Sequence, residues 1–210
     1  MQQIDPSSEA EQISYLSEEI PKALDQSLEG VQRVASIVRT MKEFSYPGSI
    51  QKVPTDIHRA IENTVVLTRS EWKGVAEVHT KFDPSVRFVP CIPDEFNQVI
   101  LNLIVNASQA IRSVGDGTKG TITIATLKHD PWVEIRISDT GPGIPKPLKH
   151  RIFDPFFTTK EVGKGTGQGL YLAHVSVVKK HGGTLSFECP PGQGTTFLIR
   201  LPACDVPPEK

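Results

Sequence analysis

The sequence has almost no excess of charge of either sign, since its 210 residues include 23 Lys and Arg against 24 Asp and Glu, a formal net charge of -1. A chain with so even a balance lacks the excess of positive charge that is typical of proteins that bind nucleic acid or an anionic membrane surface. No apolar run approaches the roughly 20 residues of a membrane span, and the first residues lack the basic and apolar regions of a secretory signal. We therefore expect a cytoplasmic chain that itself contacts neither nucleic acid nor a membrane, and we leave open whether its parent protein is membrane-anchored.

Cysteine is also scarce. The three cysteines, Cys91, Cys189 and Cys204, are widely spaced and odd in number. This pattern suits neither a disulfide framework nor a zinc site, so we interpret them as reduced thiols. What the sequence does have is an ordinary globular composition, with 38% hydrophobic and 22% charged residues, which excludes a wholly disordered chain.

Residues 1–47 predict a long N-terminal helix. Apolar residues recur at helical spacing from Ile13 to Phe44, and Pro47 with Gly48 ends the pattern. One amphipathic helix cannot bury its own apolar stripe, so it either folds back on the rest of the chain or pairs with a helix of another chain. The length of the stripe favours pairing.

Residues 48–203 predict one α+β domain. Strands in hairpins with helices between them indicate a two-layer α/β sandwich, in which helices cover one face of a mixed, mostly antiparallel sheet. The expected helices span residues 55–68, 93–113 and 167–181, and the expected strands span residues 50–53, 76–82, 86–89, 121–127, 132–138, 184–188 and 195–201. Residues 204–210 are expected to form a disordered tail.

The first candidate site feature is a stripe of carboxamides in the helix predicted over residues 93–113. Gln98, Asn102 and Asn106 are spaced by four, so they lie on one side of a helix whose neighbouring residues are apolar. These amides either bond to nearby backbone or face a polar ligand. In the second case their oxygens suit Mg²⁺, which takes few protein ligands and bridges phosphates.

The second feature is an acidic residue beside glycines. Asp139 directly follows a predicted strand, and Gly141 and Gly143 come next. The glycines either form a simple turn or serve a ligand. A flat heterocycle would suit them, because the acid accepts a hydrogen bond from an exocyclic amine and bare backbone allows close approach.

The third feature is the glycine-rich segment of residues 163–169, with four glycines in seven residues. It opens an apolar helix, so it presents backbone N–H groups to an anion. A flexible linker is the alternative, which the following helix disfavours. In the preceding loop, Phe153, Phe156 and Phe157 are too apolar for a solvated linker, and we expect them to pack when the loop closes as a lid.

The order and spacing of these segments resemble the ATP-binding domain of sensor histidine kinases, in the GHKL group with gyrase, MutL and the heat-shock chaperones. Asn102–Ala107 resembles the N box, and Asp139–Gly143 resembles the first glycine box. Phe153–Phe157 resembles the F box, and Gly165–Gly169 resembles the second glycine box. The resemblance extends over residues 50–202.

This resemblance implies ATP and Mg²⁺ as ligands. Asn106 would bind Mg²⁺, Asn102 would contact phosphate through water, and Asp139 would hold the adenine amine. Many relatives have Leu where this chain has Gln168, which we expect to change the contacts of the lid. The nucleotide-binding residues that the resemblance implies are Asn102, Asn106, Asp139, Gly141, Gly143, Ile144, Lys160, Gly165, Thr166, Gly167, Gln168, Gly169, Leu170 and Thr196.

Residues 1–47 resemble the second helix of the dimerisation and phosphotransfer hairpin of these kinases. The phosphoacceptor box, a His followed by Glu or Asp on the first hairpin helix, is missing, and none of the six histidines qualifies. We interpret all six as surface or structurally satisfied residues. We expect a C-terminal fragment that binds ATP without autophosphorylating, from a protein that is a homodimer through the hairpin and passes phosphate to a response regulator receiver domain.

The reaction that the resemblance implies is transfer of the γ-phosphoryl group of ATP to a protein histidine in a two-component phosphorelay. Hydrolytic members of the group typically carry Glu one turn before the Mg²⁺ ligand, where this chain has Asn102, which cannot take a proton at neutral pH. Transfer is therefore favoured over hydrolysis. Two alternatives are a GHKL ATPase or serine kinase of the anti-sigma or dehydrogenase-kinase type, and a nucleotide-sensing interaction module without transfer.

Overall fold

The computed structural model describes residues 15–17, 19–24, 27, 30–31, 51–86, 88–115, 117–160 and 166–203. Its contacts divide the chain into two units, Met1–Ser49 with Thr159–Thr166, and Ile50–Thr158 with Gly167–Lys210. In the first unit, the described residues of the predicted N-terminal helix are helical and nearly all exposed. The rest of that predicted helix, and the predicted tail of residues 204–210, lie outside the described residues. The prediction of one long helix is therefore supported only at those positions.

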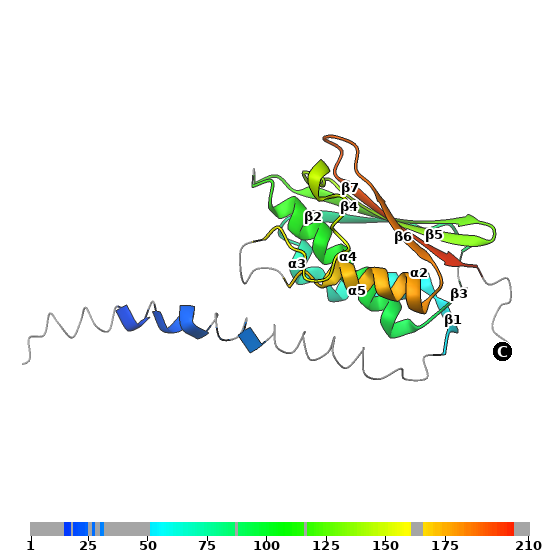
Figure 1. The fold of residues 1–210 in the computed structure, drawn as a ribbon, viewed down its shortest axis with the longest axis horizontal. Helices are drawn as coiled ribbons and strands as arrows, with labels where there is room; N and C mark the ends of the chain where they lie inside the picture. The colour runs from blue at the N-terminus through cyan, green and yellow to red at the C-terminus, as the bar shows by residue number, and fades with distance from the viewer. Residues whose placement is uncertain are drawn as a thin grey trace, which may run out of the picture. The chain divides into compact units, whose positions relative to one another are not determined.

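The second unit contains two sheets (Figure 1). A small antiparallel sheet pairs β1 (Val53–Asp56) with β3 (Phe88–Cys91). The large sheet has five strands in the order β2 (Ala76–Lys81), β4 (Gly120–His129), β5 (Trp132–Asp139), β7 (Thr195–Pro202) and β6 (Thr184–Glu188). Only the β2–β4 pair is parallel. The predicted mixed, mostly antiparallel sheet is thus confirmed.

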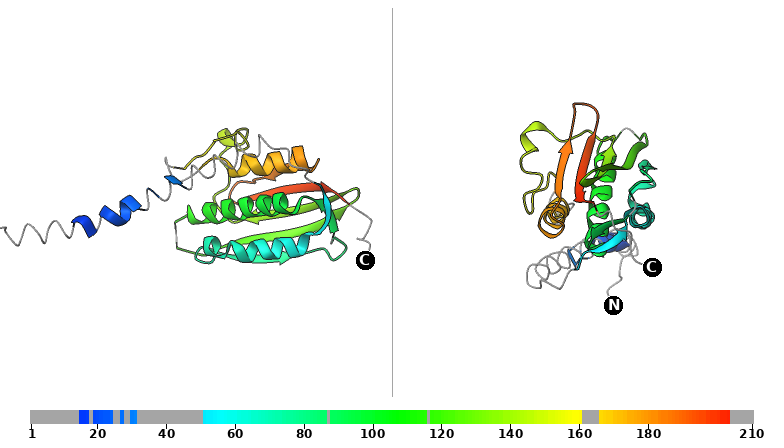
Figure 2. Two further views of the ribbon diagram at one scale, coloured as in Figure 1. Left: turned by 90° about the horizontal axis from the view of Figure 1, so that it is seen from below. Right: turned by 90° about the vertical axis from the view of Figure 1, so that its right-hand side faces the viewer.

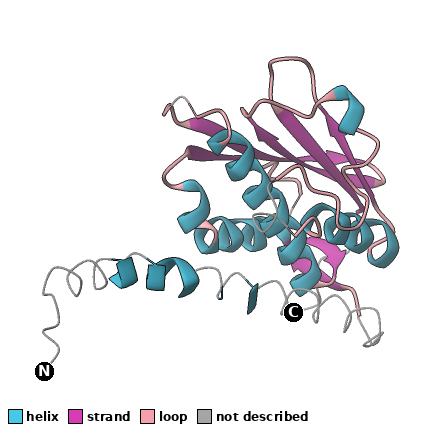
Figure 3. Ribbon diagram, turned by 60° about the vertical axis from the view of Figure 1, so that its left-hand side comes forward, coloured by secondary structure: helices cyan, strands magenta, loops and turns pink. Residues whose placement is uncertain are grey.

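The helices gather on one face of the large sheet. Figure 2 shows α2, α4 and α5 side by side over it, and Figure 3 shows the long strands of the large sheet as one layer and the helices as another. The helical segments are α2 (Ile57–Leu67), α3 (Arg69–Trp72), the 3-10 turn η1 (Lys146–Leu148), α4 (Pro93–Arg112), α5 (Gly169–Val175) and the π-helix η2 (Ser176–Lys180) that continues it. This arrangement confirms the predicted two-layer α+β architecture.

The core lies between the helices and the sheet. In β4 and β5, alternate residues such as Ile122, Ile124, Ile135 and Ile137 are fully buried, because successive side chains of a strand point to opposite faces. The central helix α4 contributes the other half of this core with Phe96, Val99, Ile100, Leu103, Ile104, Ala107 and Ile111. The opposite face of the sheet carries no helix among the described residues.

Helix α4 begins and ends where its sequence favours it. Pro93 occupies the first turn, where its missing N–H costs nothing, and Asp94 and Glu95 follow it near the positive end of the helix dipole. Arg112 lies in the last turn, near the negative end. No helix of the described residues is both long and apolar enough to span a membrane.

Several predicted bounds differ from the observed ones. The strands expected over residues 50–53 and 86–89 are Val53–Asp56 and Phe88–Cys91, because the pairing of these two strands sets their positions. The helix expected over residues 167–181 begins at Gly169 and changes to π-helix at Ser176. That change depends on packing, which the 3.6-residue period does not reveal.

Candidate functional site

Asp139 lies at the end of the central strand β5, on the face of the sheet that the helices cover. Its side chain is 5% exposed. The carboxylate atom Oδ1 accepts hydrogen bonds from the backbone N–H of Gly141 at 2.8 Å and of Thr195 at 3.4 Å. These two bonds fix the orientation of the carboxylate.

The other carboxylate oxygen of Asp139, Oδ2, accepts no hydrogen bond from any described residue. Burial raises the pKa of this carboxyl, and the bonds from Gly141 and Thr195 oppose that rise. Oδ2 is thus the carboxylate oxygen left for a ligand. A ligand that brings an N–H group to it, as an exocyclic amine does, could donate a hydrogen bond there.

The glycines after Asp139 are needed for close packing. A Cβ atom at Gly141 would lie 2.8 Å from Asp139 Oδ1 and 2.9 Å from the Cβ of Ala110 on α4. Any side chain at Gly141 would therefore push the first turn of this loop away from both the acid and the helix. The loop backbone lies directly against the carboxylate for this reason.

Cys189 supports the next part of the same loop. The backbone N–H of Ile144 donates a hydrogen bond to Cys189 Sγ at 3.0 Å. A Cβ atom at Gly143 would lie 2.8 Å from the same sulfur. No local pattern predicts this role, because Cys189 is distant along the chain and reaches the loop only through the pairing of the strands.

Thr195, and not Thr196, shares a face of the sheet with Asp139. Asp139 is the register partner of Thr195 across the β5–β7 pair. Thr196 pairs with Ser138, and its hydroxyl donates a hydrogen bond to Ser138 Oγ at 2.8 Å on the opposite face. The structure therefore does not bring Thr196 together with Asp139. A shift of one residue changes the face, and the repeated Thr in the sequence left that choice open.

Two residues of the carboxamide stripe on α4, Asn102 and Asn106, have different surroundings. Asn102 Oδ1 accepts from Gln98 Nε2 at 3.1 Å, and Asn102 Nδ2 donates to the carbonyl of Gly169 at 3.1 Å. Asn102 thus bonds to nearby protein, as the first interpretation of the stripe predicted. Asn106, one turn further along, makes no hydrogen bond to any described residue, so its amide remains available to a ligand.

Gly167 opens the segment that leads into α5. Its φ is +63°, a conformation that residues with a side chain rarely adopt, and a Cβ atom there would overlap the backbone of Phe156. The chain can therefore cross the phenylalanine loop closely at this point. Gln168 is buried and precedes α5, and Leu170 packs against the core.

The phenylalanines of this loop behave differently from one another. Phe153 and Phe157 pack against the core. Phe156 is 64% exposed and has a positive φ of 63°. In this structure Phe156 therefore does not pack, and the packing of all three phenylalanines when the loop closes stays a prediction.

Three predicted site residues are not placed relative to this site. Lys160 and Thr166 belong to the unit that contains the N-terminal residues. Burial lowers the pKa of the Lys160 ammonium group. Gly165 lies outside the described residues.

Helix α4 connects the predicted site residues of the second unit. Ala110 near its end touches the loop of Gly141, Asn106 lies one turn earlier, and Asn102 contacts Gly169 one turn before that. Ala110 lies eight positions after Asn102, which is about 12 Å along the helix axis at 1.5 Å per residue. The acid, the available amide and the start of α5 are thus held along one side of a single rigid helix.

The six histidines fit their interpretation as surface or satisfied residues. His181 is buried and hydrogen-bonded, and the Nε2 atom of His58 lies 3.0 Å from Thr126 Oγ1. The ring of His174 packs on Phe153 with centroids 4.9 Å apart. His79, His129 and His150 are exposed.

Within the described ranges, no group of three or more His, Cys, Asp or Glu residues is arranged to hold a metal ion. A cation at this site would therefore depend on the Asn106 oxygen and on the ligand's own oxygens. That donor set suits Mg²⁺, which keeps several waters and is commonly held together with substrate phosphates.

Comparison with known proteins identifies one family. Residues 91–205 match the model of the histidine kinase-, DNA gyrase B- and HSP90-like ATPase family. The sensor kinase CckA of Brucella abortus is 34% identical over 187 residues, which are 83% of this chain and 19% of CckA. The chain therefore spans about a fifth of the length of that relative.

Solved structures agree in fold. The catalytic domain of the histidine kinase ThkA is 28% identical to this chain, with a TM-score of 0.64. The match includes 73% of this chain and 99% of the ThkA domain. ThkA in complex with the response regulator protein TrrA covers 96% of this chain and 53% of its own length, with 23% identity and a TM-score of 0.66. The second likeness supports the fold alone.

Proposed function

Because the chain belongs to the family of histidine kinase-, DNA gyrase B- and HSP90-like ATPases, we propose that it binds ATP with Mg²⁺ beside Asp139 and α4 and transfers the γ-phosphoryl group to a protein histidine. The chain carries the ATP-binding catalytic domain of a sensor histidine kinase. The assignment of individual residues and of the phosphoryl acceptor is the proposal.

The observation that carries this proposal is the buried carboxylate of Asp139. Two backbone N–H groups orient it through Oδ1, while Oδ2 has no donor among the described residues. Oδ2 would accept a hydrogen bond from the adenine amine. Gly141, where a side chain does not fit, would let the base approach the loop, and Gly143 and Ile144 would line it further along.

The phosphate end of the site would lie toward Asn106 and the start of α5. Asn106 Oδ1 is the available oxygen for Mg²⁺, which when bound neutralises charge on the phosphates. Gly165, Gly167 and Gly169 would let the backbone wrap the triphosphate, flanked by Thr166, Gln168 and Leu170. Lys160 would add a positive charge when the lid closes over the phosphates.

Phosphoryl transfer to a histidine would require this chain mainly to position ATP and the acceptor. A ring nitrogen of the acceptor histidine attacks the γ-phosphorus with its own lone pair, the bond from that phosphorus to the bridging oxygen breaks, and ADP leaves with that oxygen. No side chain has to activate a water molecule. Asn102 fits this requirement, because its amide cannot take a proton and is held by Gln98 and Gly169.

The acceptor and the next partner would come from outside the described residues. The proposed acceptor is a histidine on the first helix of a dimerisation hairpin, and the proposed next acceptor is an aspartate of a response regulator. The solved complex of ThkA with the response regulator TrrA is a precedent for the second partner. Dimerisation through the hairpin and a cytoplasmic location complete the proposal.

The decisive experiment supplies the missing acceptor. The chain is incubated with γ-labelled ATP and Mg²⁺ and a separately produced hairpin that bears the acceptor histidine. Acid-labile label on the hairpin is expected, and much less label is expected with Asp139→Asn at an ATP concentration near the dissociation constant of the unmodified chain. Steady release of inorganic phosphate without transfer would instead indicate an ATPase, and ATP binding with neither reaction would indicate a nucleotide-sensing module.

A further inference from the structure

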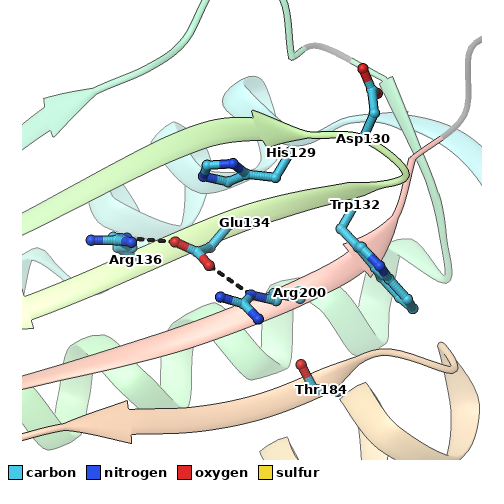
Figure 4. Close-up of a pocket in the computed structure, with 7 residues that line it drawn as sticks. All are labelled: His129, Asp130, Trp132, Glu134, Arg136, Thr184 and Arg200. Atoms are coloured by element: carbon cyan, nitrogen blue, oxygen red, sulfur yellow. Dashed lines mark hydrogen bonds and ion pairs between the residues drawn. The ribbon is translucent and has the colours of Figure 1, made fainter.

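The uncovered face of the large sheet carries a cavity of about 530 Å³ that is separate from the proposed ATP site (Figure 4). In β5, Glu134 and Arg136 alternate with the core residues Ile135 and Ile137, so they point away from the helices and from Asp139. The cavity is lined by His129, Asp130, Trp132, Glu134, Arg136, Thr184 and Arg200.

A buried carboxylate organises this cavity. The side chain of Glu134 is only 1% exposed, although it lies on the sheet face without helices. Its two oxygens accept from Arg136 Nε at 2.6 Å and from Arg200 Nε at 2.7 Å. Burial opposes ionisation of Glu134, but the bonds from Arg200 and Arg136 outweigh it and hold the pKa of the carboxyl below its ordinary value.

The two guanidinium groups remain half-exposed, and most of their donors are unused. The side chains of Arg136 and Arg200 are 41% and 55% exposed. A guanidinium carries five N–H bonds, and each arginine bonds to Glu134 through Nε. Their Nη atoms make no hydrogen bond to any described residue. Two positive charges thus surround one covered negative charge.

The rest of the lining of the cavity comes from His129, Asp130, Trp132 and Thr184. In Figure 4 the indole of Trp132 lies toward one end of the cavity, directed away from the Arg200 guanidinium, and Thr184 presents a hydroxyl from β6, the edge strand of the sheet. Asp130, whose side chain is 69% exposed, forms an ion pair with Lys128 at 3.4 Å. The cavity therefore offers two ordered arginines and, toward one end, an indole ring.

We propose that this cavity binds an acidic segment of a partner protein, with an Asp or Glu side chain held by the Nη atoms of Arg136 and Arg200 and an adjacent apolar side chain against Trp132. Guanidinium groups pair with carboxylates through two parallel hydrogen bonds, which gives both strength and direction. Glu134 holds both arginines in place in advance, so binding orders fewer side chains. The open position of the cavity beside an edge strand favours an extended peptide.

The test is a titration of the whole ¹⁵N-labelled chain followed by NMR. The signals observed are the Nε–H groups of Arg136 and Arg200 and the indole N–H of Trp132. The probe is the peptide acetyl-Leu-Glu-Glu-Leu-amide, and the matched control peptide has Gln in place of both Glu residues. We expect saturable shifts of all three signals with the acidic peptide and none with the control.

Variants then assign the binding to the arginines. Arg136→Gln and Arg200→Gln are each expected to weaken peptide binding at least tenfold, about the cost of losing a charged hydrogen-bond pair. Arg69→Gln, at the exposed start of α3, makes the same charge change elsewhere and is expected to leave binding unchanged. ATP affinity of each variant checks that its fold is retained.

Three outcomes would overturn the proposal. The first is equal shifts with the Gln peptide, and the second is equal shifts with inorganic phosphate, which would indicate a small-anion site. The third is the absence of saturable shifts in the unmodified chain. If an arginine variant fails to fold, the comparison of the two peptides on the unmodified chain still decides the matter.

Discussion

Asp139 depends on its neighbours more than on its own sequence context. Its carboxylate is held by the backbone N–H groups of Gly141 and Thr195, which are distant from each other along the chain. Only a residue without a side chain fits at Gly141. The orientation of this one acidic side chain therefore depends on a loop and on a neighbouring strand that both converge on it.

We predict that Asp139→Asn weakens ATP binding by about 10- to 100-fold, the cost of losing one charge-assisted hydrogen bond and leaving a buried amide mispaired. Isothermal titration calorimetry measures the affinity. The matched control is Asp130→Asn, in the exposed turn between β4 and β5 at the other end of β5 from Asp139, which should bind ATP as the unmodified chain does. Unchanged affinity in Asp139→Asn would refute the adenine assignment.

At the scale of elements, α4 and α5 are joined by one carboxamide. Asn102 bonds to Gln98 within α4 and to the carbonyl of Gly169 at the start of α5. Asn106, on the same stripe, makes no such bond to a described residue. Two identical residues one turn apart therefore have different physical roles.

We predict opposite behaviour for two alanine variants. Asn102→Ala should lower the free energy of unfolding by about 1–3 kcal/mol, because the Gly169 carbonyl and the Gln98 amide lose a partner. Asn106→Ala should leave the free energy of unfolding nearly unchanged but remove the Mg²⁺ dependence of ATP binding. Urea unfolding and calorimetry with and without Mg²⁺ provide the two readouts. Equal loss of stability in both variants would contradict this separation.

The end of the π-helix is tied to the start of α4 by a neutral histidine. His181 Nε2 accepts from the backbone N–H of Ile92 at 3.0 Å, and Nδ1 lies 2.8 Å from the carbonyl of Ser176. Since Nε2 accepts, Nδ1 must carry the ring proton. Protonation of Nε2 would break the bond to Ile92.

We predict that this tie makes stability depend on pH. Burial lowers the pKa of His181 from its ordinary value of 6.5, which the hydrogen bond to Ser176 only partly opposes. The unfolded chain therefore binds this proton more readily than the folded chain. The contribution to the free energy of unfolding is fully present above about pH 6.5 and is lost as pH falls through the lowered folded pKa.

Urea unfolding at several pH values tests this dependence. In His181→Gln, the decrease in the free energy of unfolding below about pH 6.5 that we assign to this histidine should be absent. His79→Gln, which alters an exposed histidine on β2, should retain it. A slope unaffected by His181→Gln would show that other groups control the pH dependence.

At the scale of the whole molecule, the core belongs entirely to the second unit. Every buried hydrophobic residue of the described ranges lies between Ile57 and Leu201. The described residues between 15 and 31 are nearly all exposed. The second unit therefore has the hydrophobic core that independent folding requires.

We predict that removal of residues 1–49 leaves the melting temperature and the ATP affinity nearly unchanged, because no core residue is lost. Differential scanning calorimetry of both chains, each with and without ATP, measures the effect. ATP at 100 times its dissociation constant should add about 2.7 kcal/mol to the stability of both. A truncated chain that melts several degrees lower would show that the first residues stabilise the domain.

Much of this fold was predictable because local patterns and tertiary structure agree. The buried positions of α4 follow the helical period, and Ile122, Ile124, Ile135 and Ile137 follow the strand period. The face of Thr196 and the support from Cys189 were not predictable. Each depends on how β7 or the β6–β7 turn meets β5, which local sequence does not encode.

The sequence by itself determined the chemistry: an acid beside glycines, amides spaced by four and a glycine-rich segment before a helix, because spacing along a helix or strand fixes which side chains share a face. Only the tertiary structure decided the surroundings of each of these residues. Strand register placed Thr195 beside Asp139, and the approach of α5 gave Asn102 a hydrogen-bond partner that Asn106 does not have among the described residues. It also placed Arg136 and Arg200, from different strands, around one buried carboxylate, since residues far apart in sequence meet only when the sheet forms.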